Sequence, residues 1–339
     1  MTPELIEAWD DLAEATGGSY FQTGSWALAW WDHLAGQPET RVAMWRGSDG
    51  SLEAVCAVSR VRRPLLTGKG PTVAVWTNAG SGAGAGDHLG WPASTDRRRQ
   101  AQLDWALATC SGPVMLSNLA SDRTAGLANR GFDLIDLSPT LAAPLGSGEN
   151  WFPGSNDFRK KLRYYGRQLD KAGVKLEVVD ATRIDGGLLD RLLDLHAARS
   201  DHMGWGTHFD ADRRGFHLQL IDHGREGRGP AMCVARRDDE VVGILYGFRF
   251  GSSFSYFQTG WSNEFVKQSL GSVLVWHTME WAAENGATMF DFLRGDDEYK
   301  RRFGAEPRSD TTWMLARRAA GKALRARQAA ADRLKRRAS

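Results

Sequence analysis

A charged segment near the end of the chain holds the residues whose types and spacing are most suited to chemistry. The apolar run at residues 288–293 predicts a strand, and Tyr299 follows it within a cluster of acids and bases. A phenol at that place can protonate a departing thiolate as a general acid. Glu264, upstream in the same half of the chain, can take a proton from an amine, directly or through water.

Two charged residues frame the end of this expected strand. Asp291 alternates with Phe290 and Phe292, so its side chain points away from both rings. A carboxylate in an apolar strand is either paired or functional. Arg294 can form an ion pair with Asp291 or contact a substrate, and the sequence leaves both an ion pair and a catalytic role open for Asp291.

A loop of small and polar residues precedes the helix expected at residues 270–284. It supplies five candidate residues for binding a donor molecule: Gln268, Ser269, Leu270, Gly271 and Ser272. Backbone N–H groups and the helix dipole at such a helix start favour an anion, for example the pyrophosphate of coenzyme A. The alternative is that Gly271 only lets the turn close.

Candidate substrate-binding residues lie in two other places. His196 and Arg199 are three positions apart on the helix expected at residues 188–203, and with Trp205 they could wall a cleft. Packing on the helix surface is the alternative. Asp87 and His88 follow a run of glycines and alanines, which could approach a ligand closely or form a flexible surface loop.

Composition narrows the class of protein. The chain has 339 residues, 42% of them hydrophobic and 25% charged, as expected for a soluble globular protein of two domains. It has no run of about 18 apolar residues, and its acidic start lacks the regions of a signal peptide. Three distant cysteines and eight histidines without metal-ligand spacing predict reduced thiols, a cytoplasmic location and no metal site.

The net charge of +2 is unevenly distributed along the chain. Residues 317–339 contain nine Lys or Arg and one acid, so they carry 9 − 1 = +8 and the rest of the chain carries 2 − 8 = −6. Together with a basic helix expected at residues 157–172, this tail could contact RNA, anionic lipid or an acidic partner. A solvated helix that aids solubility is the alternative.

The order of the expected elements predicts an α+β fold built from two similar halves. Each half has helices, antiparallel strands, a small-residue loop, a helix, a strand, a short helix and a last strand. A linker rich in proline and glycine separates the halves. The expected division is residues 1–145, residues 150–316 and a basic helical tail at residues 317–339.

Several segments together resemble the Gcn5-related N-acetyltransferase (GNAT) superfamily. They are residues 21–26 with Trp30-Trp31, residues 158–162, 196–199, 260–261 and 291–300. More narrowly, the chain resembles CelD-like or BioF2-like acetyltransferases, which carry a duplicated, tandem GNAT fold akin to that of Fem-type aminoacyl-tRNA ligases. The loop from Gln268 is similar to the family's Q/R-x-x-G-x-G/A loop for acyl-CoA, and residues 299–304 are similar to its tyrosine element.

The resemblance implies an acyltransferase that moves an acyl group from acyl-CoA to an amine of a small molecule, amino acid or sugar. Acetyl-CoA is the expected donor. The donor would lie along residues 256–260, whose backbone N–H groups would polarise its carbonyl. Two alternatives remain open. One is a Fem-like transferase that uses aminoacyl-tRNA, with the basic helix and tail contacting the RNA. The other is a non-catalytic scaffold with a degenerate GNAT fold.

Overall fold

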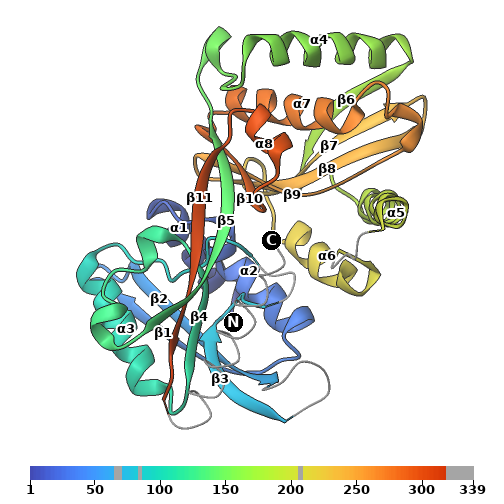
Figure 1. Cartoon of the computed structure of the whole chain (residues 1–339). Coiled ribbons are helices and arrows are strands. Elements are labelled where there is room, and N and C mark those ends of the chain that lie inside the picture. Colours follow the sequence, from blue (N-terminus) through green and yellow to red (C-terminus); the bar gives the residue numbers. More distant parts are fainter. Residues whose placement is uncertain (65–70, 83–85, 205–208, 318–339) are drawn as a thin grey trace, which may run out of the picture. The chain divides into compact units, whose positions relative to one another are not determined.

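The computed structural model describes residues 1–64, 71–82, 86–204 and 209–317 (Figure 1). Their contacts divide the chain into two compact units. Unit 1 comprises Met1–Ser138 and the chain from Ser309 onward, and unit 2 comprises Pro139–Arg308. Both units combine helices with a sheet, which confirms the α+β class predicted from the sequence.

Unit 1 contains a mixed sheet with strands in the order β1-β2-β3-β4-β11. These strands are β1 (Glu39–Arg46), β2 (Leu52–Pro64), β3 (Thr72–Asn78), β4 (Val114–Leu119) and β11 (Glu306–Leu315). The helices are α1 (Pro3–Ala15), α2 (Gly24–Ala29) and α3 (Asp96–Thr109), with short turns at Tyr20–Gln22, Trp30–Leu34, Ser121–Arg123 and Ala128–Arg130.

Strand β2 is buried on both faces, which explains its unbroken apolar run. Val55 and Ala57 point to one face and pack with residues of α1 and α2. Cys56 and Val58 point to the other face and pack with α3. Successive side chains of a strand point to opposite faces, so a strand covered on both faces loses the alternation of a half-exposed one.

Unit 2 contains strands in the order β5-β10-β9-β8-β7-β6. They are β5 (Asp133–Pro144), β6 (Val174–Asp180), β7 (Gly229–Arg237), β8 (Glu240–Phe250), β9 (Ser253–Trp261) and β10 (Met289–Arg294). The helices are α4 (Asn156–Lys171), α5 (Gly186–Met203), α6 (Arg214–Asp222), α7 (Leu270–Glu284) and α8 (Glu298–Arg302), with short turns at Gly148–Asn150, Ala211–Arg213 and Asn263–Phe265. Helices α4 and α7 lie on one side of these strands, and α5 and α6 on the other (Figure 1).

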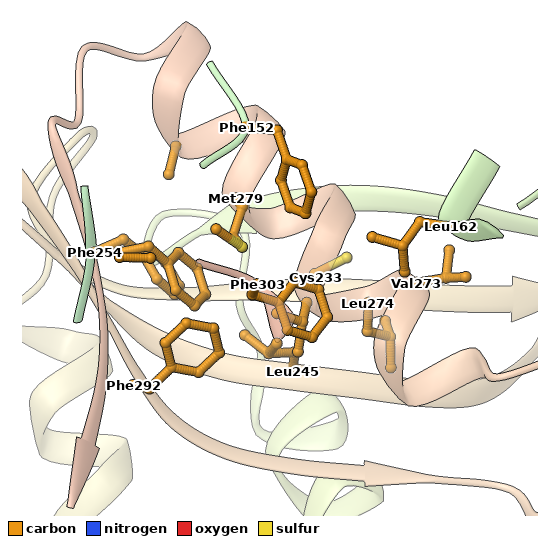
Figure 2. Packing of buried hydrophobic residues seen from close by; sticks show 14 of the residues in the cluster. Phe152, Leu162, Cys233, Leu245, Phe254, Val273, Leu274, Met279, Phe292 and Phe303 are labelled. Atoms are coloured by element: carbon orange, nitrogen blue, oxygen red, sulfur yellow. The ribbon is translucent and has the colours of Figure 1, made fainter. Parts of the chain in front are cut away.

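The core of unit 2 is aromatic where α7 and α8 meet the sheet (Figure 2). Phe254 of β9 stacks on Phe290 of β10, with ring centroids 5.3 Å apart. Phe292 contacts Phe303, which closes α8 against the strands. Truncating such a buried ring to alanine typically costs about 3–5 kcal/mol, so these rings fix where β10 and α8 lie.

Strands β9 and β10 separate shortly after they begin to pair. They are parallel neighbours only from Met289 opposite Ser253 to Asp291 opposite Ser255. At the point of separation Leu293 has a left-handed φ of 56°, and its N–H donates to Asp291 Oδ1 at 2.7 Å. A β-bulge in β9 opposite Gly247 adds local twist. Beyond this point the edge of β9 faces a cavity.

Two strands carry the chain between the units. Strand β5 contains the boundary between Ser138 and Pro139, and β11 contains the boundary between Arg308 and Ser309. Strand β11 pairs antiparallel with β4 inside unit 1, with Thr311 opposite Leu119. The sequence-based division assigned this strand to the second half. The predicted basic tail lies outside the described residues after Arg317.

Candidate active site

A cavity of about 450 Å³ opens in unit 2 where β9 and β10 separate. Four segments contribute its lining: His196, Arg199 and Ser200 of α5; Tyr256, Gln258, Thr259 and Trp261 of β9; Gly271, Ser272 and Val275 of α7; and Asp297, Tyr299 and Phe303 in and around α8. The candidates that the structure brings together are therefore His196, Arg199, Gly271, Ser272 and Tyr299.

Two phenols meet at the wall of the cavity. Tyr299 of α8 and Tyr256 of β9 form a side-chain hydrogen bond. Burial raises the pKa of Tyr256 to about 12, and the hydrogen bonds with Tyr299 and Thr259 oppose that rise. Tyr299 is 41% exposed as a residue, and its partial burial raises its pKa, which the neighbouring Tyr256 and Asp297 raise further. Both phenols are therefore protonated at neutral pH.

Lys300 holds the segment that carries Tyr299. Its buried ammonium group donates to the carbonyl oxygens of Arg294 and Gly295, at 2.7 and 3.2 Å, and lies 3.1 Å from Asp297. A buried cation is stable only when its donors are used, so these contacts fix the turn between β10 and α8. Asp297 and Tyr299 are thereby placed at the cavity.

The ring of His196 has a defined protonation pattern. Nδ1 lies 3.0 Å from the carbonyl oxygen of Thr259, which can only accept, so Nδ1 carries the proton. In the neutral ring Nε2 is then an acceptor, and the hydroxyl of Ser200 lies 3.3 Å from it. His196 and Ser200 both line the cavity, so a ligand there can interact with Nε2 or with the Ser200 hydroxyl bonded to it.

Burial lowers the pKa of His196 below its ordinary value. The hydrogen bond to the Thr259 carbonyl acts in the opposite direction, and the positive charge of Arg199 lowers the pKa further. The imidazole is therefore neutral at physiological pH and can accept a proton. Gly260 permits this arrangement, because a Cβ there would lie 2.5 Å from the backbone nitrogen of His196.

An aromatic and cationic pair forms another part of the wall. The guanidinium of Arg199 lies over the indole of Trp261, 4.1 Å from the ring centroid. The same indole packs on the first turn of α7, where a Cβ on Gly271 would lie 2.6 Å from Trp261 Nε1. The close packing of Trp261 therefore favours glycine at position 271, and Gly271 also lines the cavity.

The other residues of the α7 loop lie around the cavity without lining it. Gln268 Oε1 is buried and has no hydrogen-bond partner among the described residues. The carbonyl of Ser269 accepts from the N–H groups of Ser272 and Val273, and Leu270 is fully buried in the core. The N–H groups of Ser272 and Val273 are therefore already used. An anion at this helix start would contact the N–H groups of Leu270 and Gly271 instead.

The predicted acids lie elsewhere in unit 2. Glu264 is half exposed and forms an ion pair with Arg237, and it is not part of the cavity lining. Asp291 is buried and accepts the N–H of Leu293, where it supports the separation of β10 from β9. Arg294 is exposed at the end of β10, and neither residue lines the cavity.

The remaining candidates lie outside this site. Asp87 and His88 belong to unit 1, where His88 pairs with the buried Asp310 through Nδ1 at 2.7 Å and through its backbone N–H at 2.6 Å. Trp205 falls outside the described residues. Within the parts of the chain that the structure describes, no group of three or more His, Cys, Asp or Glu could hold a metal ion, and no helix could span a membrane.

Sequence reasoning missed several side chains of the lining, of which Tyr256, Gln258, Thr259, Ser200 and Asp297 carry polar groups. Gln258 Oε1 accepts the N–H of Thr259 at 2.9 Å, on the edge of β9 that has left its partner strand. The signal available in the sequence was a polar pair, Gln258-Thr259, near the end of a strand rich in aromatic residues. Ser200 carried a weaker signal, four residues after His196 on one helix face.

The fold is shared with solved structures of low sequence identity. FemX matches with a TM-score of 0.67 and 14% identity, over 91% of this chain and 95% of that one. The C-terminal domain of a putative lysylphosphatidylglycerol synthetase from Agrobacterium fabrum matches with a TM-score of 0.62 and 11% identity, over 96% of both chains. L-PGS from Bacillus licheniformis matches with a TM-score of 0.59 and 14% identity, over 95% of both.

A sequence-family match locates the domain more narrowly. The model described as an acetyltransferase (GNAT) domain matches residues 156–301, which run from the start of α4 into α8. No curated protein matches the sequence significantly. The matched segment contains every residue that lines the cavity except Phe303. Residues 156–301 of this chain thus match the GNAT acetyltransferase domain, as the sequence motifs predicted, and the fold of the chain is similar to that of FemX.

Proposed function

We propose that unit 2 transfers an acyl group from acyl-CoA, with acetyl-CoA as the first donor to test, to the amine of a small molecule, amino acid or sugar. The observation that carries this proposal is the separation of β9 from β10, which opens the cavity lined by Tyr256, Tyr299 and His196. One wall offers protonated phenols and another offers a neutral imidazole. Direct attack of an amine on a thioester needs both a hydrogen-bond donor and a proton acceptor.

The lining fits the thioester end of acyl-CoA. Trp261, Val275 and Phe303 supply apolar surface, and the open edge of β9 supplies backbone groups for an extended, amide-containing chain. The N–H of Thr259 lies on that edge and is held by Gln258 Oε1. If the carbonyl oxygen of an acyl group took the place of Gln258 Oε1, the N–H of Thr259 would polarise that carbonyl. The first turn of α7 would meet the pyrophosphate.

His196 is the residue that we assign as proton acceptor. Its Nε2 is basic, its pKa is lowered by burial, and it lines the cavity directly and through Ser200. Glu264, which the sequence suggested for this role, is already in an ion pair outside the lining. Positioning of the amine and the thioester in one cavity would contribute further to the rate.

The phenols are assigned as hydrogen-bond donors to the departing sulfur. The pKa of Tyr256 is about 12, and an ordinary thiol has a pKa of about 8.5, so complete proton transfer would be uphill by about 5 kcal/mol. A hydrogen bond to the thiolate needs no such transfer and is worth about 1.5–3 kcal/mol. Tyr299 therefore stabilises the leaving group by turning its single O–H from Tyr256 to the sulfur.

The test is CoA release from acetyl-CoA by the full-length chain in the presence of a panel of amines, followed by mass spectrometry of the acylated product. We expect product formation, and a kcat about 10–100-fold lower in Tyr299→Phe. Tyr164→Phe is the matched control, since Tyr164 is an exposed phenol on α4. Full activity in Tyr299→Phe would remove that residue from the mechanism. Absence of both turnover and a thermal shift with any thioester or charged tRNA would favour the scaffold alternative.

A second candidate donor is aminoacyl-tRNA. It is favoured by the basic surface of α4, where Lys160, Lys161, Arg163, Arg167 and Lys171 are exposed. Such a surface suits a phosphate backbone. Offering acetyl-CoA and charged tRNA side by side distinguishes the donors by which is consumed. Consumption of charged tRNA that Arg163→Gln and Arg167→Gln leave unchanged would exclude α4 as the RNA-binding surface.

A further inference from the structure

A second, smaller cavity lies in unit 1, between α3, β4 and the turn at Ser121–Arg123. Its volume is about 40 Å³. Leu103, Leu116 and Leu127 give it apolar walls, and Arg99 and Arg123 are the charged residues of its lining. No carboxylate is among the described residues that line it. We call it the Arg123 cavity.

Arg123 is buried with its hydrogen-bonding capacity only partly used. Its side chain is 3% exposed. One nitrogen, Nη2, donates to the carbonyl oxygen of Thr16 at 3.2 Å. Nε lies 3.2 Å from Asp122, a carboxylate that is 62% exposed and therefore largely solvated. Nη1 is buried and has no hydrogen-bond partner among the described residues. A buried charged donor without a partner is costly.

The positive charge of Arg99 adds to the free-energy cost of burying Arg123. Arg99 faces the same cavity, and its ion-pair partner Asp96 is almost fully exposed. Burial lowers the pKa of Arg123, Asp122 opposes this, and the positive charge of Arg99 lowers it further. Two cations at one small cavity therefore repel each other with little local compensation.

The backbone nevertheless makes room for this arginine. A Cβ on Gly90 would lie 2.8 Å from Cγ of Arg123, so glycine at that position allows the side chain to lie where it does. The amide of Gln102, another member of the lining, already donates to the carbonyl oxygens of Val55 and Pro92. The packing thus accommodates a buried guanidinium beside a cavity with apolar walls, and no carboxylate is among the described residues of the lining.

We propose that the Arg123 cavity binds the anionic group of a small ligand, a carboxylate or a phosphate, between Arg99 and Arg123. An oxyanion there would accept from the buried Nη1 and reduce the repulsion between the two cations. The volume admits only the anionic group, so the rest of a larger ligand would lie outside the cavity. This site belongs to unit 1 and does not depend on the acyl-transfer proposal for unit 2.

The test measures thermal unfolding and calorimetric binding of the full-length protein with sodium acetate or sodium phosphate, at an ionic strength held constant with sodium chloride. We expect a saturable rise in Tm with at least one anion, and which anion acts distinguishes a carboxylate ligand from a phosphate ligand. Arg99→Gln should weaken the Kd at least about tenfold. Arg97→Gln is the matched control, because it removes the same charge from an exposed position of α3 outside the lining.

Either of two results would overturn the proposal. One is the absence of a saturable response to both anions, which would leave Arg123 as a structural tie to Thr16 with water at Nη1. The other is a response of equal size in Arg99→Gln and the wild type, which would place the anion elsewhere, for example at the α7 start in unit 2. Because Arg99 is partly exposed and its ion pair is on the surface, its variant is expected to fold even if Arg123→Gln does not.

Discussion

His196 donates its Nδ1–H to the backbone carbonyl of Thr259 at 3.0 Å, and this bond joins helix α5 to the edge of β9 that has left its neighbouring strand. The bond fixes the tautomer of the ring. It also fixes the distance between the imidazole and the strand along which we place the acyl donor. The site therefore depends on close contact between α5 and β9.

The tautomer can be observed directly. We predict that the neutral ring of His196 is protonated on Nδ1, because a carbonyl can only accept. We also predict that its pKa lies below the ordinary value, since burial disfavours the charged form. Two-bond ¹H–¹⁵N NMR of the full-length protein across a pH titration measures both, with His196→Gln to assign the signals. A ring protonated on Nε2 when neutral would contradict the proposed role.

A methyl group at Gly260 should separate α5 from β9. A Cβ there would lie 2.5 Å from the backbone nitrogen of His196 and 2.8 Å from Leu195 Cβ, so the helix would have to move. We expect Gly260→Ala to lower stability by about 1–3 kcal/mol and to lower kcat/KM. Urea unfolding and the CoA-release assay measure the two effects.

The control for this change is Gly112→Ala, because nothing lies within 4 Å of a Cβ at Gly112 and its φ is not left-handed. That variant should keep both wild-type stability and activity. If Gly260→Ala behaved like the control, the contact between α5 and β9 would not position the site.

The two phenols should act as one unit. Because Tyr256 and Tyr299 are hydrogen-bonded, removing either hydroxyl removes the bond that joins them. We predict that Tyr256→Phe and Tyr299→Phe each lower kcat about 10–100-fold. The double variant should lose much less than the product of the single losses. Losses that simply multiply would show that the hydroxyls work independently.

A buried histidine outside the site should make stability depend on pH. His217 is fully buried, and burial lowers its pKa from 6.5 to about 3. The folded state then binds fewer protons than the unfolded state between these values, so this contribution to stability is complete above pH 6.5 and is lost as the pH falls. Between pH 7 and pH 5 the loss is about 2 kcal/mol.

Urea unfolding at the two pH values measures this loss. His217→Gln removes the titrating group and keeps a side chain that can reach the hydroxyl of Tyr246, which lies 3.4 Å from His217 Nδ1. The free energy of unfolding should change less with pH in the variant, by about the same 2 kcal/mol. An identical pH dependence in the two proteins would show that other groups account for it.

The parts of the fold that follow from local patterns could be predicted from the sequence. The α+β class, the helix at α7 and the strand at β10 follow from periodicity, turn residues and apolar runs. His196, Arg199 and Tyr299 could be named as candidates because polar side chains at the ends of apolar elements are conspicuous. Their meeting at one cavity depends on the separation of β9 and β10, which no local pattern encodes.

Other features required knowledge of tertiary contacts. In the basic run Lys300-Arg301-Arg302, the sequence does not reveal that Lys300 is the buried member. The carboxylate of Glu264 could be identified as a possible base, but its ion pair with Arg237 joins positions 27 residues apart. The glycine at position 271 fitted an anion loop, and its contact with Trp261 depends on how α7 meets the end of β9.

The position of β11 has a consequence for the order in which the protein is made. Unit 1 pairs its strand β4 with residues from Thr311 to Leu315, which follow the whole of unit 2 along the chain. During synthesis every residue of Pro139–Arg308 leaves the ribosome before residues 311–315 do. Synthesis of the chain therefore begins with unit 1 and also ends with it. Until residues 311–315 have been made, the edge of β4 that β11 will cover remains exposed to other chains.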